Sequence, residues 1–117
     1  MSKTGEISYV EFPAQDVAAV KRFYTEAFGW RFTDWGPTYV DFQGAGLGGG
    51  FQADPAEAPA KPLVIVHAED LEAMEAKVRA AGGVITRPIF SFPGGRRFHF
   101  RDPSGNELAV VTPDTHD

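Results

Sequence analysis

Three ionisable side chains alternate with two phenylalanines near the end of the chain. If the run Arg97, Phe98, His99, Phe100, Arg101 forms a β-strand, both phenylalanines share one face and the other three residues share the opposite face. A histidine there can transfer a proton near neutral pH. Two guanidinium groups beside it offer planar donors for a carboxylate or phosphate. We therefore predict a site with His99 as a catalytic residue and Arg97 and Arg101 as substrate-binding residues.

Each of these residues also has a purely structural explanation. His99 can be a partly buried histidine that forms one hydrogen bond and takes part in no reaction. Arg97 and Arg101 can form ion pairs at the rim of the site with the nearby carboxylates, namely Glu11, Asp41, Asp102 and Glu107. The sequence leaves both alternatives open.

The same alternation assigns more residues to the face that carries His99. Either Tyr9 or an arginine is expected to stabilise a developing oxyanion, and Tyr9 is the second catalytic candidate. In the run at 63–66 both faces are apolar, with Leu63 and Ile65 on one of them. The remaining substrate-binding candidates are Glu11, Tyr39, Asp41, Leu63, Ile65, Phe92, Glu107 and Ala109.

The elements that must position these residues occur twice. A shift that carries Tyr9 onto Leu63 also carries Asp16 onto Asp70, and each aspartate stands where a helix N-cap is expected. Apolar residues then recur every three or four positions, and glycines at 29 and 82–83 end the two helices. Three β-like runs follow each helix, at about 30–33, 38–43 and 47–52, then 84–87, 96–101 and 107–112. The prediction is an α+β fold in which a βαβββ unit is used twice.

The segment 53–62 is rich in alanine and proline and is predicted to be a linker between a first module, 1–52, and a second module with a tail, 63–117. Modules of about fifty residues bury their own sheets poorly. We therefore expect residues 1–117 to form a single domain.

Composition narrows the class of protein. The formal charge of −5 and the pI of about 5.1 argue against nucleic acid or an anionic membrane as a partner. The chain has no cysteine, which excludes disulfides and cysteine nucleophiles. It also lacks a signal-peptide pattern and any long apolar run, so a cytoplasmic location is expected.

Two other segments have alternative interpretations. The segment 89–98, with Phe90 and Phe92 before Pro93, is either an aromatic lid loop or a plain hairpin packed on the partner subunit. The glycines between Gly44 and Gly50 favour a sharp bend, or a close approach of a ligand or of another backbone, over a phosphate cradle. Core or dimer-interface packing is expected for Trp30, Phe32 and Trp35.

The duplicated βαβββ unit, the opening YVEFPAQDVAAVKRFYTEAFGW with its D-x6-FY-x4-G-W ending, and the turn DPSGNELAVV resemble the vicinal oxygen chelate superfamily. This superfamily is also called the glyoxalase/bleomycin-resistance/dioxygenase family. The resemblance implies two curved four-stranded sheets that form a cup, usually completed by dimerisation, with a site on the concave faces. It also implies, for metal-dependent members, a ligand of His/Gln/Glu type on the first strand of each half and a glutamate on the last.

In this sequence the implied ligand positions fall on Tyr9, Leu63, Ala109 and one of Gly48 and Gly49, none of which is an imidazole or a carboxylate. We therefore expect no metal at the usual site and no cofactor. The alternative is a metal held by shifted ligands drawn from Glu11, Asp41, His99 and Glu107.

The expected function is a homodimeric protein that binds a small organic molecule, as a lyase or isomerase acting without the family's usual metal. One alternative is a non-catalytic protein that sequesters a ligand or antibiotic. A second is a metal-dependent enzyme similar to lactoylglutathione lyase with shifted ligands, and a third is a regulatory protein whose own side chains fill the cup. Glu11, Asp41 and Glu107 suit a cationic ligand and the arginines an anionic one, so the sequence does not identify the ligand.

Overall fold

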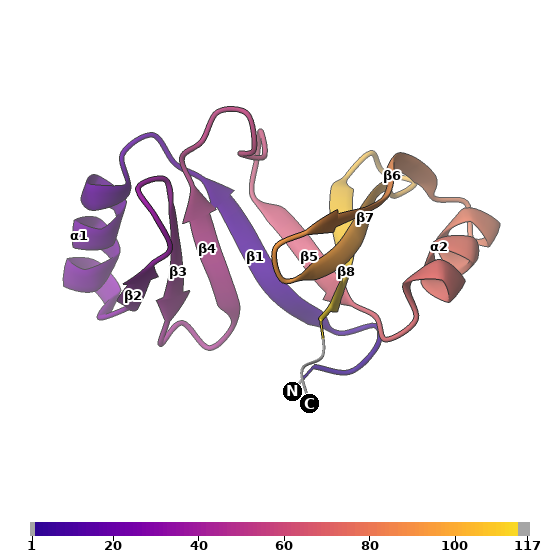
Figure 1. Ribbon diagram of the computed structural model, residues 1–117, viewed down its shortest axis with the longest axis horizontal. Helices are drawn as coiled ribbons and strands as arrows, with labels where there is room; N and C mark the ends of the chain where they lie inside the picture. Colours follow the sequence, from indigo (N-terminus) through magenta and orange to yellow (C-terminus); the bar gives the residue numbers. More distant parts are fainter. Residues whose placement is uncertain (1, 115–117) are drawn as a thin grey trace. The chain divides into compact units, whose positions relative to one another are not determined.

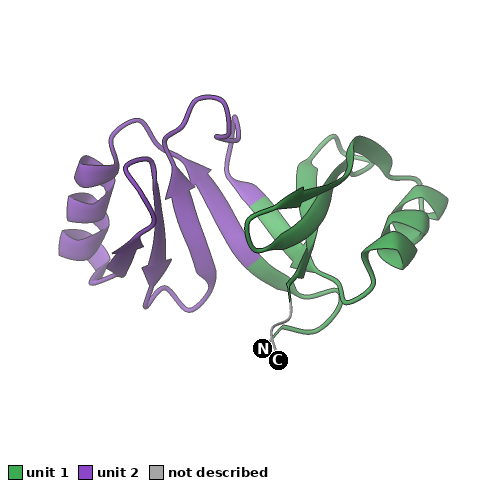
Figure 2. Cartoon of the chain, in the orientation of Figure 1, with its two compact units in different colours: residues 1–8, 64–117 green, residues 9–63 purple. Residues whose placement is uncertain are grey.

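The computed structural model describes residues 2–114, which form two compact units (Figure 2). Of the described residues, 2–8 and 64–114 belong to unit 1, and 9–63 belong to unit 2. The described chain contains the two helices and eight strands labelled in Figure 1, and it repeats the order βαβββ twice, which confirms the predicted α+β class. The first repeat has β1 (Ile7–Pro13), α1 (Val17–Phe28), β2 (Arg31–Asp34), β3 (Tyr39–Gln43) and β4 (Gly48–Gln52). The second has β5 (Leu63–His67), α2 (Leu71–Ala80), β6 (Val84–Phe92), β7 (Gly95–Arg101) and β8 (Glu107–Pro113).

The sheet of unit 2 has the strand order β2-β3-β4-β1, in which only β1 and β4 are parallel. Helix α1 begins after Asp16, whose carboxylate accepts a hydrogen bond from the backbone N–H of Ala19 at 3.1 Å. It ends at Gly29, whose φ of 75° is in the left-handed region that glycine adopts without strain. Both ends of α1 are therefore where the sequence predicts them.

The core of unit 2 is aromatic and lies between α1 and one face of the sheet. Val40, Phe42 and Phe51 are buried, and Trp30 stacks on both Phe42 and Tyr24 with ring centroids 4.6 and 4.7 Å apart. Partly buried side chains that complete this core are Phe12, Ala14, Val17, Val20, Phe32 and Ala45. Core packing is confirmed for Trp30 and Phe32, whereas Trp35 is 65% exposed.

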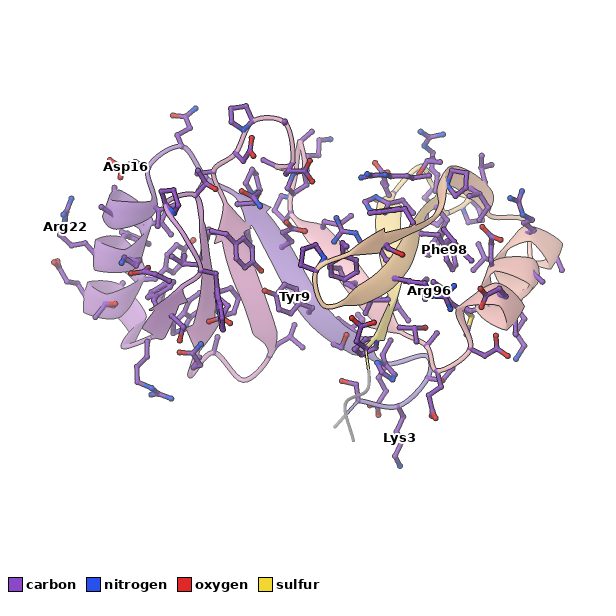
Figure 3. The ribbon with its side chains drawn as sticks, in the orientation of Figure 1. Lys3, Tyr9, Asp16, Arg22, Arg96 and Phe98 are labelled. Carbon is purple, nitrogen blue, oxygen red and sulfur yellow. The ribbon has the colours of Figure 1, made fainter. Side chains whose placement is uncertain are left out.

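Unit 1 repeats this arrangement with the order β5-β8-β7-β6, in which β5 and β8 are parallel. The Asp70 carboxylate caps α2 by accepting from the N–H of Ala73 at 3.0 Å. Phe98 is completely buried with Leu71 and Val110 on the side of β7 that faces α2 (Figure 3). Phe100 packs on the same cluster, so the face opposite α2 is left to His99, as predicted.

The main difference from the predicted elements is the length of β6. This strand continues to Phe92, which pairs with Gly95 across a turn at Pro93 and Gly94. Residues 89–98 therefore form a hairpin and not a loop, and packing of this hairpin on a partner subunit stays a prediction. The physical reason is that aromatic residues favour strands and the pairing resumes after a local irregularity between Ile85 and Phe90.

The segments outside the sheets are short. Residues 53–62 form turns, and the last three residues of the predicted tail, 115–117, lie outside the described residues. The backbone of Gly5 and Glu6 exchanges hydrogen bonds with His67 at 2.8 Å, which attaches residues before Ser8 to unit 1. Among the described residues, no helix is both long enough and apolar enough to span a bilayer.

Candidate functional site

The polar face of unit 1 is organised by one row of paired residues across four strands. Ile65 on β5 pairs with Ala109 on β8, which pairs with His99 on β7, which pairs with Arg87 on β6. Directly paired residues point to the same face, with side chains about 5 Å apart. The row therefore places the apolar side chains of Ile65 and Ala109, a histidine and a guanidinium group side by side.

His99 is held by a carboxylate at one ring nitrogen. Its Nδ1 lies 3.3 Å from Oε2 of Glu107, and that oxygen also accepts a hydrogen bond from the hydroxyl of Thr86 at 3.0 Å. A carboxylate only accepts, so Nδ1 carries the proton and Nε2 has a free lone pair. Within residues 2–114, Nε2 is buried and has no hydrogen-bond partner. This is the geometry of a base whose tautomer is fixed.

The pKa of His99 lies below the ordinary value for histidine. Burial is the largest cause, because it disfavours the charged ring, and the positive charge of Arg97 is the second. The hydrogen bond and negative charge of Glu107 act in the opposite direction, and Arg87 lowers the pKa further. The ring is therefore neutral at pH 7 and able to accept a proton.

Two phenylalanines support the arginines on this face. The guanidinium carbon of Arg87 lies 3.6 Å from the centre of the Phe90 ring, and that of Arg97 lies 5.3 Å from Phe90 and 5.1 Å from Phe92. The Phe90 ring centre is in turn 5.9 Å from that of His99. Arg101 pairs with Glu107 in register but is exposed, and it forms no ion pair with any described residue.

The polar face of unit 2 has a different centre. The hydroxyl groups of Tyr9 and Tyr39 form a hydrogen bond, although their strands are separated by β4. Glycine makes this possible, because a Cβ at Gly50 would lie inside the contact distance of the Tyr39 hydroxyl and 2.7 Å from the carbonyl oxygen of Val40. At Gly50 the group that approaches closely is thus a tyrosine side chain, and not the ligand or the backbone that the sequence predicts for the glycine run.

Burial raises the pKa of both tyrosines, since it disfavours the charged phenolate. The negative charges of Asp41 and Glu11 raise the pKa of Tyr9 further, while its hydrogen bond with Tyr39 lowers it. Both hydroxyl groups are therefore neutral O–H donors at pH 7. Glu11 itself is only 7% exposed.

Asp41 accepts two hydrogen bonds from neutral groups. The indole N–H of Trp35 donates at 2.9 Å to one oxygen, and the amide of Gln43 donates at 2.6 Å to the other. No positively charged side chain of the described residues forms an ion pair with this carboxylate. The Asp41 carboxylate therefore has hydrogen-bond partners, but no positively charged group of the described residues neutralises it.

The residues at the family's ligand positions do not fit a divalent metal. Leu63 and Ala109 are buried alkyl side chains without a lone pair, and the Tyr9 hydroxyl is neutral and hydrogen-bonded to Tyr39. The strand pairing gives Gly50, rather than Gly48 or Gly49, as the counterpart of Ala109, because Gly50 pairs with Glu11 as Ala109 pairs with Ile65. No group of three or more His, Asp or Glu side chains in the described part of the chain is arranged to hold a metal.

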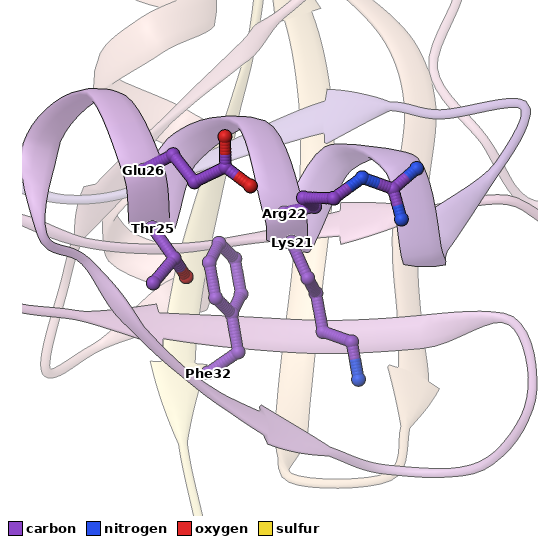
Figure 4. A pocket seen from close by; sticks show the side chains of 5 residues that line it. All are labelled: Lys21, Arg22, Thr25, Glu26 and Phe32. Carbon is purple, nitrogen blue, oxygen red and sulfur yellow. The ribbon is translucent and has the colours of Figure 1, made fainter.

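Two hollows lie on other surfaces of unit 2. One, of about 360 Å³, lies on the outer side of α1 and β2 and is lined by Lys21, Arg22, Thr25, Glu26 and Phe32 (Figure 4). The other, of about 160 Å³, is lined by the apolar residues Val10, Phe12, Trp30, Phe42, Ala45 and Leu47. Neither includes a predicted site residue.

The structure adds residues that the sequence did not identify. Arg87 and Phe90 join His99 on unit 1, and Trp35 and Gln43 join Asp41 on unit 2. Trp35 carried a signal, since an indole N–H near an aspartate seeks an acceptor. Arg87 carried none, because the irregular pairing of β6 decides which face it occupies.

Comparison with known proteins gives a consistent match. Residues 6–110 match the family model described as the Glyoxalase/Bleomycin resistance protein/Dioxygenase superfamily. Proteins named "Putative glyoxylase CFP32" from Mycobacterium bovis and Mycobacterium tuberculosis are 25% identical over 125 residues, which cover 97% of this chain and 48% of the relative. The chain thus spans about half the length of these curated relatives.

Solved structures share the fold. Methylmalonyl-CoA epimerase from Mycobacterium tuberculosis superposes with a TM-score of 0.74 at 13% identity, covering 98% of this chain and 93% of that one. The Mn(II)-bound glyoxalase from Novosphingobium aromaticivorans superposes with a TM-score of 0.67 at 22% identity, covering 95% of this chain and 40% of that one. At these identities the likeness establishes the fold alone.

Proposed function

Because the chain belongs to the glyoxalase/bleomycin resistance protein/dioxygenase superfamily, we propose that it binds a small organic molecule and moves a proton on it, as a lyase or isomerase acting without the metal of the metal-dependent members. One observation carries this proposal. His99 is neutral, its Nδ1 is held by Glu107, and its Nε2 is buried without a partner among the described residues. A ring in this state is prepared to accept a proton from a carbon acid.

The proposed step requires only residues of unit 1. Nε2 of His99 takes a proton from a carbon next to a carbonyl group, which leaves the electron pair on the carbonyl oxygen as an enolate. Glu107 stabilises the imidazolium that forms, and the nearby charges of Arg87 and Arg97 favour the enolate. The proton on His99 exchanges with solvent, and its return to another carbon of the ligand, with the enolate electron pair forming the new C–H bond, completes an isomerisation.

Proton exchange in heavy water tests the proposal directly. Methylmalonyl-CoA and the hemithioacetal of methylglyoxal and glutathione are suitable probes, because the similar proteins are named for an epimerase and glyoxalases. Incorporation of deuterium, followed by NMR, is expected to fall about 10²–10⁴-fold in His99→Gln. His67→Gln is the matched control, since His67 lies at the end of β5 in the same unit and is expected to keep the full rate. Full activity in His99→Gln contradicts the proposal.

Independence from a metal is tested separately. We expect protein purified without chelators to contain no stoichiometric Mn, Fe, Ni or Zn, and exchange to continue after treatment with a chelator. The reason is that Leu63 and Ala109 offer no donor atoms. Restoration of activity only by an added divalent metal would show that shifted ligands operate.

A second function is favoured by Asp41. A carboxylate that accepts only from neutral donors, beside the exposed indole of Trp35, suits a cationic ligand, as in a protein that sequesters a cationic antibiotic. Titration with bleomycin and with tetramethylammonium, followed by tryptophan fluorescence, tests this function. Binding is expected to be lost in Asp41→Asn, which keeps the shape of the side chain.

The other site assignments stay predictions: Tyr9 as an oxyanion donor, and as substrate-binding residues Glu11, Tyr39, Asp41, Leu63, Ile65, Phe92, Arg97, Arg101, Glu107 and Ala109. Homodimerisation and a cytoplasmic location are also predictions. Light scattering of the purified protein measures the first of these two properties.

A further inference from the structure

Arg87 occupies an unusual place in β6. The pairing of β6 with β7 shifts register on both sides of this residue, between Ile85 and Arg87 and again between Arg87 and Phe90. Pro88, which lacks an N–H group, lies within the second irregularity. Bulges of this kind redirect a side chain at the edge of a sheet. Here the result is that Arg87 is the cross-strand neighbour of His99.

The guanidinium group of Arg87 is fixed by an aromatic ring rather than by a carboxylate. It lies 3.6 Å from the centre of the Phe90 ring. No Asp or Glu of the described residues forms an ion pair with it, whereas Arg96 and Arg79 each contact a glutamate of α2. Stacking on a ring covers the face of a guanidinium and leaves its N–H edge available. Arg87 is therefore an exposed cation that has no ion-pair or hydrogen-bond partner among residues 2–114, in a chain whose net charge is −5.

The surroundings of Arg87 favour an anion. Arg97 adds a second positive charge beside Phe90, and the negative Glu107 is already engaged by His99 and Thr86. On the β5 side the row contains only the apolar side chains of Ala109 and Ile65. An anionic group placed at Arg87 would thus lie next to the residue that pairs with it across the strands, His99.

We propose that Arg87, braced on Phe90, is an oxyanion-binding residue that recognises the carboxylate or phosphate group of a small anionic ligand and places the rest of that ligand at His99. The inference rests on the proposed function only for the role of His99 as a base. Binding of the anion is a separate property, so it can be measured without turnover.

NMR of histidine-labelled protein tests the binding site. Propionate and methyl phosphate are titrated at constant ionic strength against sodium chloride, and the ring signals of His99 are followed, with His67 as an internal reference. Saturable movement of the His99 signals by either probe supports the site, and the more effective probe identifies the group recognised. The pKa of His99 is expected to rise when the anion binds, since the anion offsets the charge of Arg87.

Variants separate this role from general charge effects. Arg87→Met is expected to weaken binding of the better probe about tenfold or more, because a charged hydrogen-bond donor is lost. Arg87→Lys is expected to be intermediate, since it keeps the charge but loses the planar fork. Phe90→Leu is expected to weaken binding about two- to fivefold by removing the ring that holds the guanidinium.

Arg79→Met is the matched control, because Arg79 is an exposed arginine on α2, and it is expected to bind the probes unchanged. Equal affinity in Arg87→Met and the original protein overturns the inference, as does a failure of both probes to move the His99 signals beyond the sodium chloride control. If the original protein exchanges protons but does not bind the probes, the anion site has failed. If it binds the probes but exchanges no protons, the proposed function has failed.

Discussion

In unit 1 a row across the sheet reads Ile65, Ala109, His99 and Arg87, whereas the corresponding row in unit 2 reads Glu11, Gly50, Asp41 and Thr33. Both rows lie on the face opposite the helix, and both follow the same pairing of strands. Their chemistry is opposite. The first combines an apolar floor with a neutral base and a cation, and the second combines two carboxylates with a bare strand.

The comparison shows that the duplicated frame determines which face a residue occupies but not what that face binds. The largest consequence comes from the difference between Ala109 in unit 1 and its counterpart Gly50 in unit 2. A methyl group on β8 packs beside His99, whereas the absence of one on β4 lets Tyr39 reach Tyr9 across the strand. A small residue in the second strand of each row therefore decides whether neighbouring side chains stand apart or meet.

Exchange of these two small residues is the strongest test. Gly50→Ala is expected to destabilise the protein by about 1–3 kcal/mol, because its methyl group meets both the Tyr39 ring and the backbone of Val40. Ala109→Gly is expected to cost about 1 kcal/mol, mainly through the greater entropy of glycine in the unfolded chain. Urea denaturation measures both. If Gly50→Ala is as stable as the original protein, the glycine is not what permits the tyrosines to meet.

Removal of one hydroxyl tests the tyrosine pair itself. Tyr39→Phe leaves the Tyr9 hydroxyl without its partner and is expected to cost about 1 kcal/mol. The pKa of Tyr9 should rise further, because the hydrogen bond from Tyr39 lowers it in the original protein. Ultraviolet difference spectroscopy during an alkaline titration follows the tyrosine ionisation.

Tyr24→Phe is the matched control for this pair. The Tyr24 ring packs in the core of unit 2, and no described residue forms a hydrogen bond with its hydroxyl. The stability of this variant is therefore expected to stay close to that of the original protein. An equal loss of stability in both variants would contradict a special role for the pair.

Much of this comparison was predictable from the sequence, because alternation in strands is a local property. It placed His99 opposite Phe98 and Phe100, and it identified the helices through their caps at Asp16 and Asp70. The register irregularity in β6 was not predictable, since it depends on pairing with β7 rather than on local preference. For this reason the sequence left both a loop and a hairpin open at Phe90 and Phe92, and it gave no role to Arg87.

The charged groups around His99 set its pKa, and each can be removed by mutation. The charged groups around its ring are Glu107 on β8, Arg97 on β7 and Arg87 on β6, while Ile65 on β5 is uncharged. Glu107→Gln removes the group that raises the pKa of His99, so this pKa should fall further. Arg87→Met should raise it. NMR titration of the ring measures both shifts, and their signs should be opposite.

This lowered pKa also makes stability depend on pH with a defined sign. Below the ordinary histidine pKa of about 6.5 the unfolded chain binds a proton at His99 that the folded chain does not. The contribution of His99 to stability is therefore constant above that pH and decreases as the pH falls toward the folded pKa. Urea denaturation at several pH values should show this decrease in the original protein and lose it in His99→Gln.

The smallest expected effect concerns Trp35. Trp35→Phe removes the indole donor from Asp41 but keeps an aromatic ring, and the side chain is 65% exposed, so the cost in stability is expected to be about 0.5 kcal/mol. Fluorescence separates the two tryptophans, because Trp30 remains stacked between Tyr24 and Phe42. Emission that remains in Trp35→Phe should come from the shielded ring and resist quenching by iodide. Since Asp41 then keeps only the hydrogen bond from Gln43, stronger binding of tetramethylammonium would indicate that Trp35 offsets the carboxylate, and weaker binding that it contacts the cation.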